Sequence, residues 1–346
     1  MQIYERDTGY ANMPEIIEAQ TPFVLCIGGR GTGKTYGAVK YLLSERQIFI
    51  YLRRTAAQAE LISKAEFCPV VKVAADMGVV LVTESLSKYV TGIYHADNDG
   101  LPVGLPVAYI MALSTMANVR SFDAGRVSVI LYDECIPERH ERSISHEADA
   151  FFNMYESIDR NRQLDGIEPV KCVCLANANN YDAPILYALR AIRPLEAMRR
   201  KRQTVKVCSE IGLTIVVLRD SPISAEKSKT ALYRLTMGSG DFADMAIDND
   251  FSRDTYSDIR RCPIAEYRPL AAIGEICLYR HKSEKLYYVS EHISGVPEMY
   301  DSTITERTRF RTKYADTWTA YMNKKLFFES AAAKVYYKAV MLDSLR

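Results

Sequence analysis

The sequence predicts an α/β fold, in which helices cover both faces of a parallel sheet, followed by a smaller α+β domain. Three observations support this prediction. Between residues 23 and 218, short apolar runs rich in β-branched residues alternate with helical stretches, as in doubly covered parallel sheets. A glycine-rich loop joins the first of these runs to the first helical stretch. After residue 222 the chain becomes polar and loses the pattern, which indicates a domain boundary.

The strands of the first domain are expected to be buried on both faces, because several of them are apolar throughout rather than alternating. They are residues 23–27, 47–52, 79–82, 107–112, 127–132, 173–175 and 213–218. In the second domain we expect strands at 267–273, 276–279 and 286–289, the last two forming a hairpin. Helical stretches are expected at 148–158 and 318–345. The two predicted domains are residues 1–222 and residues 256–346, joined by a linker or lid at 223–255.

The composition excludes several protein classes. With 48% hydrophobic and 25% charged residues among 346, the chain is typical of globular proteins. We expect no membrane contact and no secretion signal, because no apolar run is long enough for either. Eight cysteines occur without a CxxC pair, which favours buried thiols in a reducing, cytoplasmic setting. A net charge of +1 gives no global attraction to nucleic acid, so such contacts must come from local basic patches.

The glycine-rich loop matches the phosphate-binding pattern GxxxxGK[ST], known as Walker A. Glycines let such a loop turn its backbone N–H groups toward phosphate oxygens, and the following helix adds its partial positive charge. Lys34 is expected to reach the β- and γ-phosphates of ATP, and the Thr35 hydroxyl to ligate Mg²⁺. The predicted nucleotide-binding residues are Gly28, Gly29, Arg30, Gly31, Thr32, Gly33, Lys34 and Thr35.

An apolar strand ending in Asp133 and Glu134 supplies the opposite side of the predicted pocket, as a Walker B strand. The carboxyl edge of an open α/β sheet is where ligands bind. There Asp133 can hold Mg²⁺ through water, and Glu134 can orient or deprotonate the attacking water. An acid pair can also merely cap a loop. Because this acid pair follows a phosphate-binding loop in the chain, we expect it to activate water as the nucleophile. The sequence therefore predicts an ATP hydrolase.

Asn177 ends another apolar strand and is the candidate sensor of the γ-phosphate. The alternative is an asparagine that only turns the chain, since Asn177-Ala178-Asn179-Asn180 is a turn-forming sequence.

Arginines near the predicted site have open roles. Arg30 can touch phosphate, pair with Glu134 or lie idle in solvent. Arg53 and Arg54 follow the second strand, where they can position an acid, face a DNA backbone or be solvated. Arg160, and after it Arg162, are candidates for an arginine supplied to a neighbouring subunit; spacing alone favours a surface helix cap.

Two basic clusters are candidate contacts to DNA or RNA, with a solvated face as the equal alternative. One comprises residues 199–202. The other alternates its cations with Thr308, Phe310 and Thr312, so that a strand here would carry one entirely cationic face. Its members are Arg307, Arg309, Arg311 and Lys313.

Five sequence blocks together resemble the DNA-encapsidation (packaging) ATPases of small tailed phages of the phi29 type. In chain order they are GGRGTGKT, YLRR, ILYDECI, SIDRNR and CVCLANA. The similarity covers roughly residues 20–220 and thins afterwards, where DFADMAIDNDF at 241–251 is the best remaining block. It implies a P-loop fold of the additional-strand, catalytic-glutamate class, akin to terminase large subunits.

The resemblance also implies roles and partners. Lys34 and Thr35 become phosphate and Mg²⁺ ligands, Asp133 the second metal partner, Glu134 the catalytic base and Arg160 a trans-acting arginine finger. The implied assembly is a homo-oligomeric ring, expected to be a pentamer, that drives double-stranded DNA through the portal (connector) of a procapsid. It would act in the host-cell cytoplasm, transiently at the portal vertex, and be absent from the mature virion. Participation of a structural packaging RNA stays open.

The family's C-terminal domain is a vestigial RNase H-like nuclease fold, and here its carboxylates do not form a convincing set. The expected leading strand, residues 267–273, has no acid, and Glu275, Glu291 and Asp301 are scattered. We therefore expect no DNA cleavage. The stretch after Arg54 is poor in cations, and Lys64 is the nearest lysine able to face DNA.

Two other functions stay open at this point. One is a terminase large subunit with an active nuclease. The other is a non-motor, NTP-dependent switch that binds nucleic acid or a protein through its basic clusters.

Overall fold

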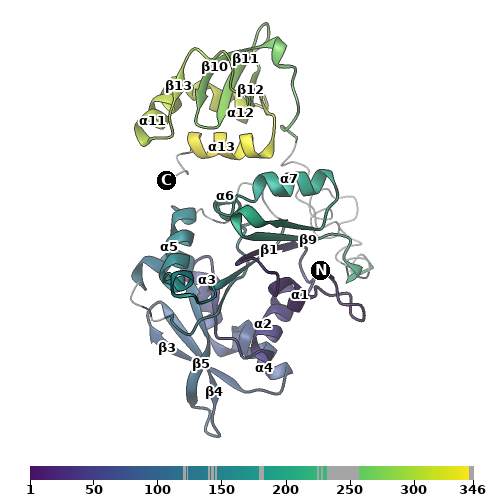
Figure 1. Cartoon of the computed structure of the whole chain (residues 1–346), viewed down its shortest axis with the longest axis vertical. Coiled ribbons are helices and arrows are strands. Elements are labelled where there is room, and N and C mark those ends of the chain that lie inside the picture. The colour runs from purple at the N-terminus through teal and green to yellow at the C-terminus, as the bar shows by residue number, and fades with distance from the viewer. Residues whose placement is uncertain are drawn as a thin grey trace. The chain divides into compact units, whose positions relative to one another are not determined.

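The protein is described from a computed structural model of the whole chain. It describes residues 1–119, 122, 124–138, 141, 144, 146–178, 183–223, 226, 229–231 and 257–342. The chain divides into two compact units, Met1–Phe251 and Ser252–Arg346, which Figure 1 shows. The division falls within the stretch expected to be a linker, 223–255. Most of that stretch, including the block at 241–251, lies outside the described residues.

The first unit is built on one sheet of nine described strands in the order β3-β4-β5-β2-β6-β7-β1-β9-β8. In chain order the strands are β1 (Phe23–Gly28), β2 (Phe49–Arg53), β3 (Leu81–Ser87), β4 (Val90–Ala96), β5 (Pro102–Ala112), β6 (Val129–Tyr132), β7 (Lys171–Ala176), β8 (Val205–Cys208) and β9 (Leu213–Leu218). All seven strands expected for this domain are present. The predicted α/β fold is confirmed.

Only the centre of this sheet is parallel. Strands β5, β2, β6, β7, β1 and β9 pair in parallel. Their Val, Ile and Leu side chains are mostly buried on both faces, except in the first half of β5, where Val103 and Leu105 are exposed. Both edges are antiparallel, through β3 and β4 at one edge and β8 at the other. Strands β4 and β8 were not predicted, because β4 carries Gly92 and polar residues and β8 has only four residues.

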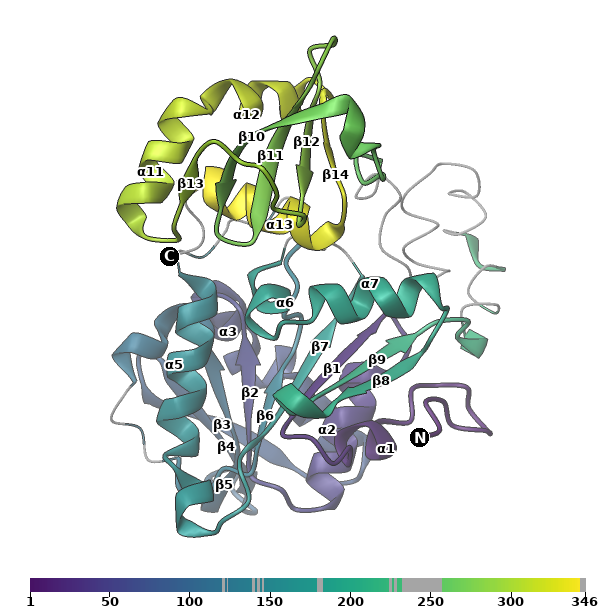
Figure 2. The same ribbon diagram turned by 45° about the horizontal axis from the view of Figure 1, so that its top comes forward.

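Helices cover both faces of the first sheet, as Figure 2 shows. One face packs against α1 (Met13–Ile17), α2 (Lys34–Ser44) and α4 (Pro69–Asp76), through a core that joins Val24 and Cys26 to Ala38 and Leu42. The other face is covered by α5 (Glu147–Asp159), α6 (Pro184–Ala188) and α7 (Ile192–Arg200). A further helix, α3 (Ala56–Ser63), follows β2 and begins at a capping box.

The second unit has a sheet of five described strands in the order β13-β10-β11-β12-β14. They are β10 (Tyr267–Ile273), β11 (Ile276–His281), β12 (Tyr287–Ser290), β13 (Met299–Tyr300) and β14 (Leu326–Phe328). The predicted hairpin is confirmed, since β11 and β12 pair in antiparallel. One core packs this sheet against α11 (Ile304–Lys313), α12 (Ala315–Met322) and α13 (Ala331–Met341).

One prediction for the second unit is wrong. The helical stretch expected at 318–345 is two helices separated by β14, because Lys324 takes a positive φ of 56° that ends α12. The cations from Arg307 to Lys313 lie on a helix, so the entirely cationic face that a strand would have is not formed. The Thr303 side chain accepts a hydrogen bond from the Glu306 backbone and so starts α11.

The cysteines are in the reduced state that the sequence predicts. All eight cysteines are free thiols, and seven of them are buried, as expected of core thiols. In the described part of the chain, no helix combines the length and apolar character needed to cross a bilayer.

Candidate functional site

The phosphate-binding loop joins the buried strand β1 to the N-terminus of α2. Gly31 and Gly33 have positive φ values of 67° and 86°, a conformation that side chains other than glycine rarely adopt. Gly33 is the N-cap of α2, and a Cβ there would lie 3.0 Å from Tyr10. The first N–H groups of α2 have no partner within the helix and are available to an anion.

Lys34 is folded back into the loop, with its residue 8% exposed. Its ammonium donates to the Gly28 carbonyl at 3.0 Å and to the Gly29 carbonyl at 2.8 Å. It also lies 3.3 Å from Asn177 Oδ1. These oxygens surround the Lys34 ammonium, and phosphate oxygens can replace them. The ammonium is therefore positioned to bind a polyphosphate.

One strand separates the loop strand from the acidic strand. The order β6-β7-β1 places β7 between them, and Asn177 follows β7 directly. The additional strand that the sequence resemblance implied is therefore present. Despite this separation, the Thr35 hydroxyl reaches Asp133, 3.1 Å from Oδ1 and 3.2 Å from Oδ2. The loop and the two strand ends form one site.

Asp133 is 5% exposed and surrounded by hydrogen-bond donors. Tyr51 donates its hydroxyl to Oδ2 at 2.5 Å, and Arg53 Nη1 lies 3.3 Å from the same oxygen. The Glu134 backbone N–H donates to Oδ1 at 3.1 Å. A carboxylate accepts about four hydrogen bonds, so Asp133 is fully satisfied as an anion.

Glu134 lies beside Asp133 in a left-handed conformation, with a φ of 53°. Such a backbone is uncommon outside glycine, Asn and Asp. The Glu134 side chain is 52% exposed and forms an ion pair with Arg53 Nη2. Arg53 thus contacts both acids, and its Nε is buried without a partner among the described residues.

Arg30 forms an ion pair with Glu138. Pairing with Glu134, one of the alternatives that the sequence left open, is not observed in the described part of the chain. The Arg30 side chain is 61% exposed at the rim of the loop. Because Arg53 already binds Glu134, the acid that Arg30 was expected to meet is engaged from the neighbouring strand β2.

A cavity of about 530 Å³ lies between the loop and the acidic strand end. Thr35, Asp133 and the cavity's backbone offer only oxygen atoms as metal ligands, the donor type that Mg²⁺ prefers. These residues fit a Mg²⁺ ion held by one hydroxyl, water and phosphate oxygens. The described lining residues are Arg30, Gly31, Thr32, Gly33, Lys34, Thr35, Tyr36, Asp133, Glu134, Leu175, Ala176 and Asn177.

Arg54 is not available to DNA, which corrects one of the predicted contacts. It is 1% exposed and forms two hydrogen bonds to Glu147, of 2.6 and 2.9 Å. A third, of 3.1 Å, joins it to Glu141. Arg53 is also mostly buried, at 12% side-chain exposure. Of the cations predicted near β2 and α3 to face DNA, Lys64 is exposed.

Arg160 and Arg162 lie at the end of α5. Arg160 is exposed, and its guanidinium donates to the Phe122 carbonyl at 2.9 Å. Arg162 is half-buried and donates to the carbonyls of Ala124 and Gly125 at 3.2 Å. Neither belongs to the described lining of the phosphate cavity.

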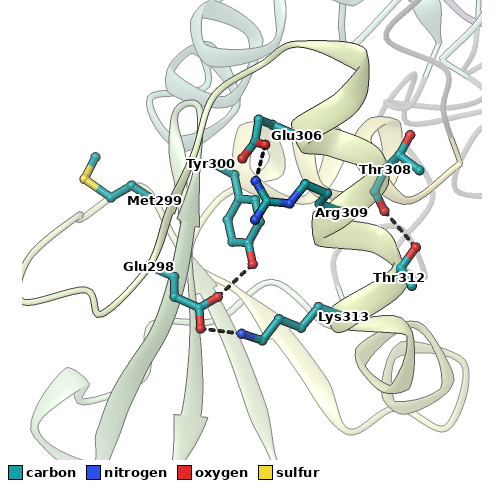
Figure 3. Close-up of a pocket in the computed structure, with 8 residues that line it drawn as sticks. All are labelled: Glu298, Met299, Tyr300, Glu306, Thr308, Arg309, Thr312 and Lys313. Carbon is teal, nitrogen blue, oxygen red and sulfur yellow. Dashed lines mark hydrogen bonds and ion pairs between the residues drawn. The ribbon is translucent and has the colours of Figure 1, made fainter.

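The predicted cations of the second unit are divided between core and surface. Arg307 is 6% exposed, which contradicts its assignment as a nucleic-acid contact. Figure 3 shows Arg309 and Lys313 at a cavity of about 660 Å³, where they bind Glu306 and Glu298. Arg311 lies 3.1 Å from the Thr308 hydroxyl. These pairs neutralise much of the charge that the sequence predicted for this segment.

Two residues of the site were missed by sequence reasoning. Tyr51 has the appearance of a core residue in an apolar run, and Glu147 that of a charge in the first turn of a helix. The only sequence signal that could identify Tyr51 as a site residue is its polar atom, in the strand next to the Walker B strand. For Glu147 the sequence offers none.

Comparisons with known proteins agree with this geometry. A family model described as podovirus DNA encapsidation protein (Gp16) matches residues 7–266. A search of curated proteins found no match. The solved structure described as the bacteriophage Phi-29 viral genome packaging motor assembly is 20% identical, with a TM-score of 0.66, covering 97% of this chain and 99% of that chain. The Phi-28 gp11 DNA packaging motor is 16% identical, with a TM-score of 0.64, covering 96% and 98%. At these identities the two structures show a shared fold.

Proposed function

The chain belongs to the podovirus DNA encapsidation protein (Gp16) family, and on this premise we propose that it is the ATPase of a genome-packaging motor. It hydrolyses ATP and uses the energy to move double-stranded DNA into a viral procapsid. The proposal rests on one observation above all. Thr35 at the end of the phosphate-binding loop and Asp133 at the end of the acidic strand lie 3.1 Å apart, with Lys34 and Glu134 beside them.

The chemistry that we propose is attack of water on the γ-phosphorus of ATP. Mg²⁺, held by Thr35 and, through water, by Asp133, would neutralise phosphate charge when bound. Lys34 exchanges the loop carbonyls for β- and γ-phosphate oxygens. Glu134 accepts the proton of the attacking water as the new O–P bond forms and the bond to the β-phosphate oxygen breaks. ADP and phosphate are the products.

Glu134 can act as this base while it stays paired with Arg53. Its carboxylate forms an ion pair with Arg53 Nη2, and because a carboxylate accepts about four hydrogen bonds, lone pairs remain to orient a water molecule. The cavity and the half-exposed Glu134 side chain leave room for that water. Asn177, 3.3 Å from the Lys34 ammonium, is proposed to detect the γ-phosphate through that lysine.

Arg160 is proposed as the arginine finger that a subunit offers to its neighbour. Its exposure at the end of α5, outside the described lining of its own cavity, supports a role in trans. Such a role requires an oligomer, and we propose a homo-oligomeric ring, of five subunits by the family resemblance, at the portal of the procapsid. The ring would assemble there in the host cell and be absent from the mature virion.

The proposed DNA contacts are the exposed cations Lys64, Arg309 and Lys313 and the half-buried Arg311, binding phosphates without reading sequence. We propose no nuclease activity. In the described part of the second unit, two acids that follow strands serve the fold: Glu329, after β14, accepts a hydrogen bond from the Glu291 backbone at 2.9 Å, and Glu291, after β12, accepts one from Ser330.

The test is the rate of ATP hydrolysis with and without double-stranded DNA, together with plasmid incubated with Mn²⁺. Hydrolysis stimulated by DNA, with the plasmid intact, supports the packaging motor. A nicked plasmid instead favours a terminase. Slow hydrolysis that is indifferent to DNA and its length favours the non-motor switch and contradicts the proposal.

A further inference from the structure

Tyr51 is a buried hydroxyl at the nucleotide site that the proposed mechanism does not use. It lies in the middle of β2, is 0% exposed, and its ring belongs to the core between the sheet and α2. Its hydroxyl nevertheless donates to Asp133 Oδ2 at 2.5 Å. A hydrogen bond from a hydroxyl to a carboxylate at this distance is of the strong, charge-assisted kind.

The register of the sheet explains why a tyrosine reaches this acid. Strands β2 and β6 pair in parallel, with Tyr51 opposite Leu131, so Asp133 lies two residues further along. Two residues of strand span about 6.6 Å, which the length of a tyrosine side chain bridges. Burial and the negative charge of Asp133 raise the pKa of Tyr51 well above its usual value, so the hydroxyl keeps its proton.

The donors around Asp133 differ in what else they do. The Thr35 hydroxyl is also the expected metal ligand, and Arg53 divides its guanidinium between Asp133 and Glu134. Tyr51 has a single O–H group and donates it in a hydrogen bond to Asp133. Of the side chains that donate to Asp133, it is therefore the one that keeps its place when nucleotide and metal draw on Thr35 and Arg53.

We propose that Tyr51 is a positioning residue for Mg²⁺: it fixes the Asp133 carboxylate so that its metal-facing side stays directed at the Thr35 hydroxyl. The inference rests on the proposed function, because it assigns a role within the same ATP site. Loss of a hydrogen bond that orients a metal partner typically weakens metal affinity 10- to 100-fold. For a water-mediated partner we expect the lower end, about 10-fold.

Tyr51→Phe removes only the hydroxyl and is the informative variant. Tyr132→Phe is its matched control, because Tyr132 is also fully buried, on the adjacent strand β6, and its hydroxyl has no hydrogen-bond partner among the described residues. ADP binding would be measured by calorimetry over a range of Mg²⁺ concentrations and in EDTA, alongside the Tm of each free protein.

The expected result is specific to the metal. Tyr51→Phe should need about 10-fold more Mg²⁺ for half-maximal tightening of ADP binding, with the affinity in EDTA unchanged. Tyr132→Phe should follow the parent. A parent-like Mg²⁺ requirement of Tyr51→Phe, whatever its Tm, overturns the inference, and so does an equal shift in both variants.

A second comparison tests whether Tyr51 acts through Asp133. In the Asp133→Asn background, Tyr51→Phe should add no further Mg²⁺ requirement, because the acid through which it acts is already gone. A further shift there contradicts the inference. Failure of the parent itself to bind ADP more tightly with Mg²⁺ would count against the ATPase proposal, whatever the variants do.

Discussion

Arg53 forms an ion pair with Glu134 while also contacting Asp133, so one guanidinium from β2 bridges both acids of the neighbouring strand end. The pair is largely sheltered from water on the arginine side, where 12% of the side chain is exposed. In this arrangement the guanidinium reduces the repulsion between the two adjacent carboxylates.

Replacement of Arg53 should therefore cost stability that Mg²⁺ partly restores. Breaking a buried ion pair by removing one partner costs about 3 kcal/mol, and Arg53→Ala leaves two neighbouring negative charges. Urea unfolding with and without Mg²⁺ measures both effects. Arg30→Ala is the control, because its pair with Glu138 is exposed on the arginine side and should contribute about 1 kcal/mol or less. Equal losses in the two variants would show that burial of Arg53 has no energetic consequence.

Arg160→Ala should inhibit intact subunits when the two are mixed. A finger that acts in trans leaves the neighbour's site incomplete, and an arginine of this kind typically contributes 10³- to 10⁵-fold to the rate. The measurement is ATP hydrolysis against the fraction of variant, with Arg162→Ala as the comparison. A rate that falls in simple proportion to the fraction of intact subunits would assign Arg160 to its own subunit or to none.

Arg309 and Arg307 should behave differently in DNA binding. Arg309 is exposed and held only by a surface pair with Glu306, so it can turn to a phosphate. Arg309→Ala should reduce the slope of log Kobs against log salt by about 0.9. Arg307→Ala should leave that slope unchanged and lower the Tm, because Arg307 is buried. An unchanged slope in Arg309→Ala would exclude Arg309 as a DNA contact.

The second unit should lose stability in acid through Glu298. Hydrogen bonds from Lys313 and Tyr300 lower the pKa of this carboxyl, so it contributes stability above its unfolded value of about 4.3. That contribution is lost as the pH falls through the lower, folded value. Trp318, the single tryptophan of the chain, packs in this unit and reports its unfolding by fluorescence.

Glu298→Gln should therefore flatten the dependence of that unfolding transition on pH below about 5. Glu284→Gln, at an exposed turn position, is the matched control and should keep the parent's dependence. An unchanged dependence in Glu298→Gln would mean that its pairs with Lys313 and Tyr300 do not form in solution.

The sequence predicts this site well where chemistry requires short motifs and poorly where it depends on distant partners. The loop from Gly28 to Thr35 and the pair Asp133–Glu134 are local patterns flanked by apolar strands, so both position and role can be predicted. The burial of Arg54 cannot be predicted in this way, because its partner Glu147 is 93 residues away, at the start of α5. From the sequence alone, a cation next to Arg53 is expected to be exposed, because nothing nearby in the chain indicates its buried partner.

The same distinction between local patterns and distant contacts holds for secondary structure. Strands such as β1 and β9 are uniformly apolar and were located within a residue. β14 has only three residues between two helices and is held by parallel pairing with β12, a contact between segments that the local sequence cannot show. The basic run in α11 alternates in sequence, yet the Thr303 cap starts a helix that places Arg307 and Phe310 in the core.

The most direct test of the central claim is hydrolysis by Glu134→Gln under conditions where nucleotide binding is measured in parallel. Loss of the general base should lower the rate of ATP hydrolysis by at least about 100-fold, while ATP still binds between the phosphate loop and Asp133. Glu45→Gln, an exposed change at the far end of α2, should match the parent in both. Hydrolysis by Glu134→Gln at the parent's rate would contradict the account.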